Sequence, residues 1–204
     1  MFKEAKGEIN SFLKNYTSDS DRWTFLNECA NKFYEEAKGL RNRESSRASQ
    51  QAEIALMVYE KLLSIAARNA KYKKFYDSIQ NRVAETYRDG KQTAKAKTIY
   101  QEILERDPTS ADAIQNLGLI YEEEGQWEEA LATWRKFSRG LETGSYYWFE
   151  SKYRTAKVLN QLGKKEEACE IITVIHVLHP ELRDEEFKKK FTKLQGEVCR
   201  KEVN

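Results

Sequence analysis

Apolar residues recur at intervals of three and four along most of this chain, which is the spacing of a buried helix face and not the alternation of a strand. The segment 117–137 shows this most clearly, with one apolar set on each side of Gly125. The sets are Leu117, Gly118 and Tyr121, then Ala130, Trp134 and Phe137. The segment therefore predicts two helices joined by a turn, with the small residues Gly118 and Ala130 where the helices cross closely.

This pair of helices recurs with a period of 34 residues. One copy earlier stand Val83, Ala84 and Tyr87, followed by Ala96, Tyr100 and Ile103. A later copy, with Ala168, Ile172 and Ile175, arrives four residues late, which predicts a longer loop at 138–148. The two prolines, Pro108 and Pro180, each follow the last apolar position of a copy by five residues and predict the end of its second helix. Such a period indicates stacked helix pairs.

The stretch Leu117-Gly118-x2-Tyr121…Ala130-x3-Trp134 resembles the tetratricopeptide signature W-x2-L-G-x2-Y…A-x3-F…P. The chain departs from it at Ile114, where the family prefers Trp, and at Glu142, where the closing Pro is missing. The third copy has Thr155 and Ala156 for Leu-Gly, and Leu159 for Tyr. The resemblance implies an all-α fold, a right-handed superhelical solenoid of antiparallel helix pairs with about ten helices and a C-terminal capping helix. Its three repeats would be 77–110, 111–144 and 149–182.

Residues 1–76 carry a weaker form of the pattern. Ala5, Ile9 and Phe12 are spaced like the second helix of a repeat, and Trp23-x2-Leu26 resembles the opening of the next one. The matching second helix, with Ala55, Tyr59 and Leu62, comes late, after a polar stretch at 39–50. We interpret this as a lengthened first helix plus an inserted loop. The opening half-pair leaves two interpretations, a piece cut from a longer solenoid or an N-terminal helix packed on the first pair.

Residues 183–204 predict the capping helix. Asp184 is a suitable N-cap, and Phe187, Phe191, Leu194 and Val198 share one side of the following helix. The opposite side is rich in lysine, as a helix that seals the end of a repeat array requires.

Composition narrows the class of function. Lys and Arg number 35 against 33 Asp and Glu, a net charge of +2, so a nucleic-acid partner is not expected. Mean hydropathy is −0.81 and no apolar run reaches the length of a membrane span, so membrane insertion is not expected. Cys29, Cys169 and Cys199 form no paired motif, and we expect three ordinary thiols of a reducing, cytoplasmic compartment.

The family resemblance implies a groove that is lined by the first helix of each pair and holds a peptide or helix of a partner protein. The residues expected to face it are Asn81, Arg82, Glu85, Arg88, Gln115, Asn116, Leu119, Glu122, Tyr153, Arg154, Lys157 and Asn160. Their amides and guanidinium groups suit a peptide main chain or a carboxylate. The alternative is that they are only solvated helix faces.

Chaperone-binding relatives hold a C-terminal dicarboxylate in this groove. Asn116 and Arg154 match their clamp, but Asn81, Glu85 and Glu150 replace a Lys, an Asn and a Lys. The two added carboxylates would repel the ligand, so no such clamp is expected.

An aromatic run, Tyr146, Tyr147 and Trp148, precedes Phe149 in the third copy. It is a possible contact with a partner, because aromatic side chains dominate interface energies. The alternative is packing between repeats, which we favour for Phe149 and one neighbour.

No motif of nucleophilic catalysis, phosphate binding or metal hydrolysis occurs, so we expect no enzyme and no cofactor. His176 and His179 have a spacing that permits metal binding, but no third ligand stands near, and no metal site is expected. The sequence therefore predicts a protein-binding scaffold or adaptor, monomeric or weakly homo-oligomeric, whose partner stays open. The alternatives are a structural or self-assembly module, a regulatory fragment of a larger protein and, least favoured, an RNA-binding repeat.

Overall fold

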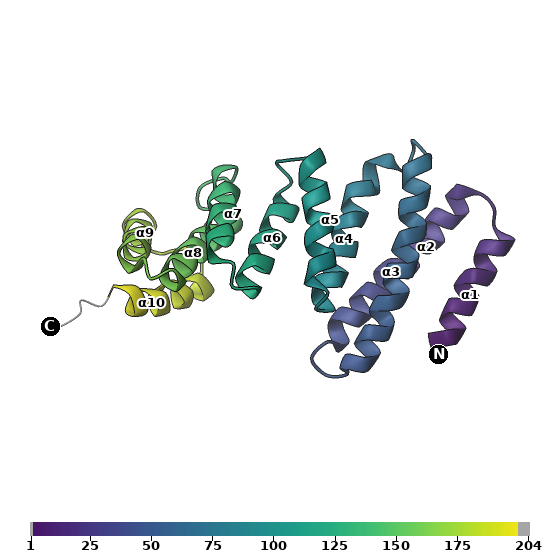
Figure 1. The fold of residues 1–204 in the computed structure, drawn as a ribbon, viewed down its shortest axis with the longest axis horizontal. Helices are drawn as coiled ribbons and strands as arrows, with labels where there is room; N and C mark the ends of the chain where they lie inside the picture. Colours follow the sequence, from purple (N-terminus) through teal and green to yellow (C-terminus); the bar gives the residue numbers. More distant parts are fainter. Residues whose placement is uncertain (1, 200–204) are drawn as a thin grey trace. The chain divides into compact units, whose positions relative to one another are not determined.

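The computed structural model describes residues 2–199 and forms an all-α chain of ten α-helices over that range (Figure 1). By packing, it divides into two compact units, Met1–Ile103 and Leu104–Asn204. This division follows packing and not the 34-residue period, so the predicted repeat boundaries stay a prediction. None of the described helices combines the length and apolar content needed to cross a lipid bilayer.

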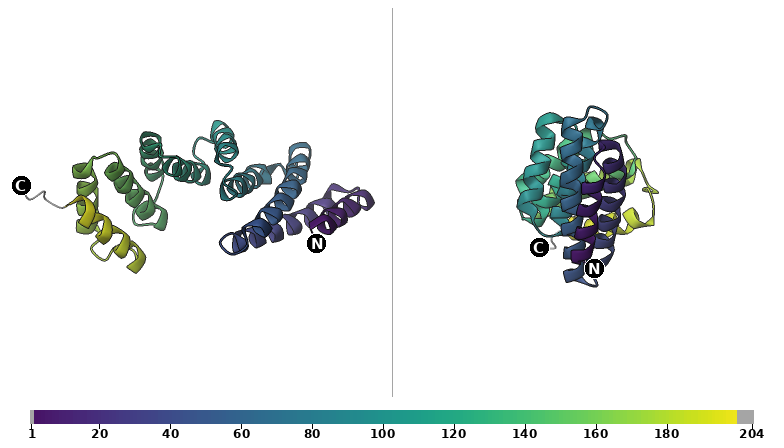
Figure 2. Two further views of the ribbon diagram at one scale, coloured as in Figure 1. Left: turned by 60° about the horizontal axis from the view of Figure 1, so that its bottom comes forward. Right: turned by 90° about the vertical axis from the view of Figure 1, so that its right-hand side faces the viewer.

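The first unit is built around a long antiparallel helix pair. Its helices are α1 (Phe2–Asn15), α2 (Asp19–Leu40), α3 (Ser45–Arg68), the short 3-10 helix η1 (Lys73–Phe75), α4 (Tyr76–Asp89) and most of α5 (Thr93–Arg106). The helices α2 and α3 pack against each other along the chain, as Figure 1 and the left view of Figure 2 show. Leu26, Ile54, Val58 and Leu62 are fully buried in the core of this unit.

The second unit contains the clearest helix pairs. Its helices are α6 (Ala111–Glu123), α7 (Trp127–Arg139), α8 (Tyr146–Gln161), α9 (Lys165–Leu178) and α10 (Glu185–Val198). Each packs against its neighbour along the chain, and α10 packs on both α8 and α9. The single core runs from Ile114 on α6 to Val198 on α10.

The close crossing of α6 and α7 confirms the expectation for the two small residues. Ala130 is fully buried, and a Cβ added at Gly118 would lie 2.8 Å from Cε2 of Trp134. The indole of Trp134 therefore occupies the space that a side chain at Gly118 would need, which is why the large residue faces the glycine.

Two predicted loops are shorter in the structure. The stretch predicted as an inserted loop at 39–50 is wrong in extent, because α2 continues to Leu40 and α3 begins at Ser45. The polar residues that open α3 are mostly exposed, and among 45–50 only Ala48 is buried. A helix turn that is solvated nearly all round resembles a loop in sequence. The late connection is also shorter than 138–148, since α7 ends at Arg139 and α8 begins at Tyr146.

The capping helix forms as the sequence predicts. The carboxylate of Asp184 accepts a hydrogen bond from the backbone N–H of Phe187 at 3.0 Å, as an N-cap does. Phe187, Phe191, Leu194 and Val198 are all buried. The part of the predicted segment after Cys199 lies outside the described residues.

The expectation of three free thiols is wrong for two of the cysteines. Cys169 on α9 and Cys199 at the end of α10 form a disulfide, with Cα atoms 5.2 Å apart, while Cys29 is free. The sequence contains no sign of this pairing, because the partners are 30 residues apart and meet only when α10 folds back on α9. The pairing also removes the support that free thiols gave to a reducing compartment.

Candidate functional site

The first helices of two neighbouring copies, α6 and α8, carry eight of the residues that the sequence assigned to a groove. They are Gln115, Asn116, Leu119 and Glu122 on α6, and Tyr153, Arg154, Lys157 and Asn160 on α8. Within each helix three of them share one face, because they stand at positions i, i+4 and i+7. All eight belong to the second unit, so their geometry can be described together.

Glu122 is the central residue of this set. Its side chain is only 6% exposed, and its carboxylate accepts a hydrogen bond from Nε1 of buried Trp134 at 2.9 Å. Lys157 donates to the same carboxylate at 2.9 Å, and Arg154 lies 3.3 Å from it. Glu122 thereby ties α6 to α7 and to α8. A buried carboxylate is tolerated when it is paired and hydrogen-bonded in this way.

Arg154 continues the network to a second buried carboxylate. Its Nε donates to Oε1 of Glu150 at 2.7 Å, and Nζ of Lys190 on α10 lies 3.4 Å from the other oxygen of Glu150. Burial opposes the charge of Arg154, but Glu122 and Glu150 outweigh it and raise the pKa of the guanidinium. Lys190 also pairs with Glu186 at 2.7 Å, and these carboxylates raise its pKa against the opposing effect of burial. We call Glu122, Glu150, Arg154, Lys157 and Lys190 the charged network.

Two predicted groove residues are buried. Asn116 is 8% exposed and its Nδ2 donates to the carbonyl oxygen of Asp112 in the same helix, and Glu122 is 9% exposed. Glu122 holds α6 to α7 and α8 through its hydrogen bonds. The expected role of both residues as contacts for a partner stays a prediction.

The six remaining groove residues of α6 and α8 are half-buried. Arg154 lies within the charged network, and we call the other five, Gln115, Leu119, Tyr153, Lys157 and Asn160, the α6–α8 surface. Leu119 and Tyr153 are partly buried and pack against the core of the second unit. Nζ of Lys190 lies 5.7 Å from the ring centre of Tyr153. The surface thus offers one aliphatic and one aromatic side chain among amides and an ammonium group.

The four predicted groove residues of the first copy lie on α4 in the other unit. Glu85 accepts a hydrogen bond from the hydroxyl of Tyr34 on α2 at 3.0 Å and pairs with Arg82 at 3.1 Å. Burial, together with Glu85, raises the pKa of Tyr34 to about 12. Arg88 lies 3.7 Å from Asp89, and Oδ1 of Asn81 is buried with no hydrogen-bond partner among the described residues. A single groove through all three copies spans both units and stays a prediction.

The aromatic run divides between core and surface. Tyr146 and Tyr147 are 39% and 49% exposed, whereas Trp148 is 9% exposed and Phe149 is 2% exposed. Trp148 packs edge-on against His179 with ring centres 5.2 Å apart, so Tyr146 and Tyr147 are the exposed members of the run, and a contact of any of the three with a partner stays a prediction. Among the described residues no group of three or more metal-ligating side chains comes together.

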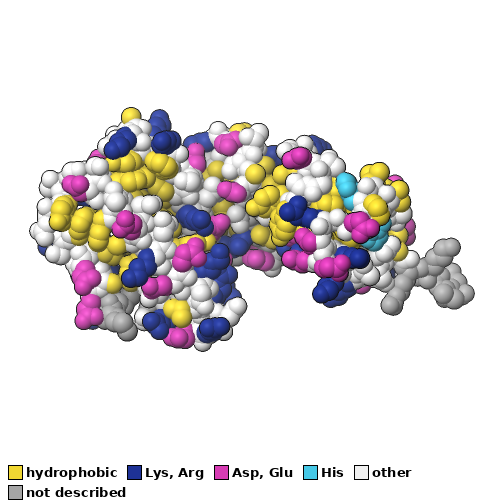
Figure 3. Space-filling view, turned by 180° about the vertical axis from the view of Figure 1, so that it is seen from behind, with side chains coloured by type: hydrophobic (Ala, Val, Ile, Leu, Met, Phe, Trp, Pro, Cys, Tyr) yellow, Lys and Arg dark blue, Asp and Glu magenta, His cyan; other side chains and the backbone are white. Residues whose placement is uncertain are grey.

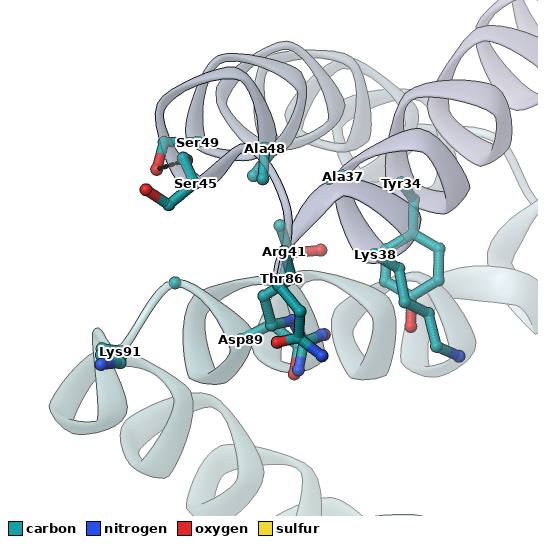
Figure 4. Close-up of a pocket in the computed structure, with 13 residues that line it drawn as sticks. Tyr34, Ala37, Lys38, Arg41, Ser45, Ala48, Ser49, Thr86, Asp89 and Lys91 are labelled. Carbon is teal, nitrogen blue, oxygen red and sulfur yellow. Dashed lines mark hydrogen bonds and ion pairs between the residues drawn. The ribbon is translucent and has the colours of Figure 1, made fainter.

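A cavity of about 410 Å³ lies in the first unit, and no sequence pattern indicates it. It is bordered by the last turns of α2 and α4 and the first turns of α3 (Figure 4). Lys38, Arg41 and Lys91 contribute three cationic groups to its wall, against one carboxylate from Asp89. The rest of the surface mixes both signs of charge, as one face of the molecule illustrates (Figure 3).

The antiparallel helix pairs and the close glycine crossing define the chain as an all-α helical-repeat protein. Two models of the tetratricopeptide repeat family match it, at residues 82–110 and 99–132. Residues 82–132 therefore match tetratricopeptide repeats. No curated protein matches the sequence as a whole.

Solved structures with the same fold cover nearly the whole chain. MamA of AMB-1 aligns with a TM-score of 0.57 and 15% identity, covering 87% of this chain and 84% of MamA. A kinesin light chain of Podospora anserina with nearly identical tetratricopeptide-like repeats aligns at 0.57 and 14%, covering 84% and 97%. BtubC from P. vanneervenii aligns at 0.56 and 16%, covering 90% and 87%. At these identities the likeness concerns the fold alone.

Proposed function

We propose that this chain is a protein-interaction scaffold without catalytic activity, and that the α6–α8 surface holds a peptide or helix of a partner protein. The repeat family and the fold shared with MamA, kinesin light chain and BtubC support a scaffold role. The specific site rests on the geometry of the second unit.

The observation that carries this proposal is the charged network that adjoins the α6–α8 surface and shares Lys157 with it. Two buried carboxylates hold the cationic groups of Arg154, Lys157 and Lys190 in place, so this surface is pre-ordered before a partner arrives. A pre-ordered surface loses less conformational entropy on binding than a mobile one. Leu119 and Tyr153 add apolar area to this polar frame, which is the mixture that peptide-binding surfaces use.

Affinity capture from the source cells tests the site when it is done with matched variants. Gln115→Ala together with Asn160→Ala removes two amides of the α6–α8 surface whose side chains make no hydrogen bond or ion pair within the described residues. The charged network and the fold should stay intact, which circular dichroism checks. Lys136→Ala, at an exposed position of α7, is the control.

A partner retained by the native chain and by Lys136→Ala, but lost by the double variant, supports the α6–α8 surface. Equal capture by all three forms would exclude this surface as the binding site, and attention would turn to Tyr146 and Tyr147.

A second candidate function is self-assembly, and the outer face of α9 favours it. Val174, Val177 and Leu178 are 48%, 74% and 64% exposed, and they stand close together at positions i, i+3 and i+4. Adjacent exposed apolar side chains mark interaction surfaces more often than single ones do. Light scattering over a concentration series tests this function, with Val177→Lys expected to abolish any association. A strict monomer at every concentration would rule it out.

A further inference from the structure

The cavity of about 410 Å³ in the first unit is lined by polar, cationic and small apolar residues. Ala37 on α2 and Ala48 and Ala52 on α3 contribute small apolar side chains to its lining. In the close-up, Ser45 and Ser49 lie on one side of the opening and Lys91 on the other (Figure 4). Its volume falls within the range of ligand sites, roughly 300–1,000 Å³, and it is several times larger than a single phosphate ion requires.

The cationic groups that line the cavity outnumber the carboxylates that could pair with them. Arg41 pairs with Asp89, which also lies 3.7 Å from Arg88, so the single carboxylate of the wall is already engaged. Lys38 and Lys91 are exposed and take part in no ion pair among the described residues, and Nζ of Lys38 lies 5.9 Å from the ring centre of Tyr34. Two ammonium groups without a carboxylate partner among those residues therefore belong to the lining of the cavity.

Lys91 stands in a backbone conformation that a lysine rarely adopts. Its φ is +59°, in the left-handed region. The equivalent turns of the next two copies have glycine there, Gly125 with φ +70° and Gly163 with φ +74°. A residue with a side chain in this region costs about 1–2 kcal/mol relative to its usual conformations. The backbone conformation alone would favour glycine at position 91, so the lysine there lowers the stability of this turn.

A favourable interaction with the negative end of a helix dipole can explain Lys38 but not Lys91. Lys38 lies in the last turn of α2 and can offset the negative end of that helix dipole. Lys91 lies beyond the end of α4, where a glycine would serve the turn better, and Arg88 already supplies a cation in the last turn of that helix. At the start of α3, the side chain of the N-cap residue Glu44 makes no capping hydrogen bond. The first backbone N–H groups of α3, near Ser45, therefore add positive potential to the cavity that Ser45 lines.

We propose that this cavity binds an acidic peptide segment, with Lys38 and Lys91 receiving its carboxylates and the three alanines receiving the aliphatic stem of a glutamate. The site lies in the first unit and does not depend on the proposed role of the α6–α8 surface. A side-chain carboxylate on a short aliphatic stem suits this lining, because the lining combines ammonium groups with small apolar side chains.

The first experiment measures fluorescence anisotropy of a labelled hexaglutamate peptide titrated with the full chain at low salt, with hexaglutamine as the neutral match. Lys91→Gly is the key variant because it relieves backbone strain while it removes the cation. We expect it to weaken hexaglutamate binding about tenfold, the loss of one charge-assisted contact, and to raise the midpoint of urea unfolding. Weaker binding by a more stable protein cannot be a folding defect.

Lys38→Gln should weaken binding to a similar degree, whereas Lys61→Gln on the exposed face of α3 should change it less than twofold. The Gln115→Ala, Asn160→Ala variant of the other unit should bind hexaglutamate normally, so this proposal and the proposed function fail separately. Equal affinity of native chain, Lys91→Gly and Lys38→Gln would overturn the proposal. Displacement of the peptide by an equal concentration of inorganic phosphate would overturn it also, because the cavity would then select an anion and not a peptide.

Discussion

Single residues determine how closely the helices of the second unit approach. Trp134 is fully buried, and its indole nitrogen is held by Glu122, so the ring cannot turn away without losing that hydrogen bond. Gly118 faces the flat side of this ring with no room for a methyl group. The glycine is therefore required by a fixed neighbour and not by its backbone conformation.

Gly118→Ala should destabilise the second unit by about 1–3 kcal/mol, because a Cβ would meet Trp134 at 2.8 Å. This loss exceeds the gain of roughly 1 kcal/mol that alanine brings to a helix. Urea unfolding followed by circular dichroism measures the difference. Gly196→Ala on α10 is the control, since nothing lies within 4 Å of its added Cβ, and it should be neutral or stabilising. If Gly118→Ala were as stable as the control, the crossing would be looser than described.

Glu122→Gln should cost about 2–3 kcal/mol of unfolding free energy. The substitution keeps the size of the side chain but leaves half-buried Arg154 with Glu150 as its one carboxylate partner, and removing one partner of a mostly desolvated charge is expensive. Lys157, which is 39% exposed, can turn to water and limits the loss. Glu123→Gln, one residue along and exposed, should change stability by less than about 0.5 kcal/mol. Equal stability of the two variants would mean that the charged network contributes nothing.

At the scale of elements, the sequence predicted what depends on local periodicity and spacing. The glycine crossing, the ends of α5 and α9 before Pro108 and Pro180, and the cap at Asp184 all follow from neighbouring residues. What depends on long-range contact was missed. The burial of Glu122 could not be predicted, because its partners lie on α7 and α8 and are distant in sequence. The start of α3 was taken for a loop because nothing apolar marks its first turn.

The last helix is held by a covalent link as well as by packing. The Cys169–Cys199 disulfide closes a segment of 30 residues that includes all of α10. Its removal should lower the stability of the second unit by about 3–4 kcal/mol, the loop-closure entropy for that separation. Unfolding with and without a reductant measures the effect, and Cys199→Ser should reproduce it. Cys29→Ser should leave the dependence on reductant unchanged, because Cys29 is free. Identical midpoints in both conditions would show that packing alone holds α10.

At the scale of the whole chain, each unit has its own core. One core draws its buried residues from α1 to α4, and the other from α6 to α10. In repeat proteins stability is approximately a sum of local terms, so a local change need not spread along the array. The two candidate binding sites, the cavity beside Lys91 and the α6–α8 surface, therefore belong to separately stabilised parts of the chain.

Hydrogen exchange tests this independence directly. Reduction of the disulfide should accelerate amide exchange in α8–α10 by about 100-fold, which corresponds to roughly 3 kcal/mol. Amides near Leu62, in the core of the first unit, should keep their protection, because no part of that core draws on α9 or α10. Acceleration confined to the second unit means that either site can be altered by mutation without disturbing the other. Equal acceleration in both units would show that they unfold as one, and variants at either site would then need stability controls for the entire chain.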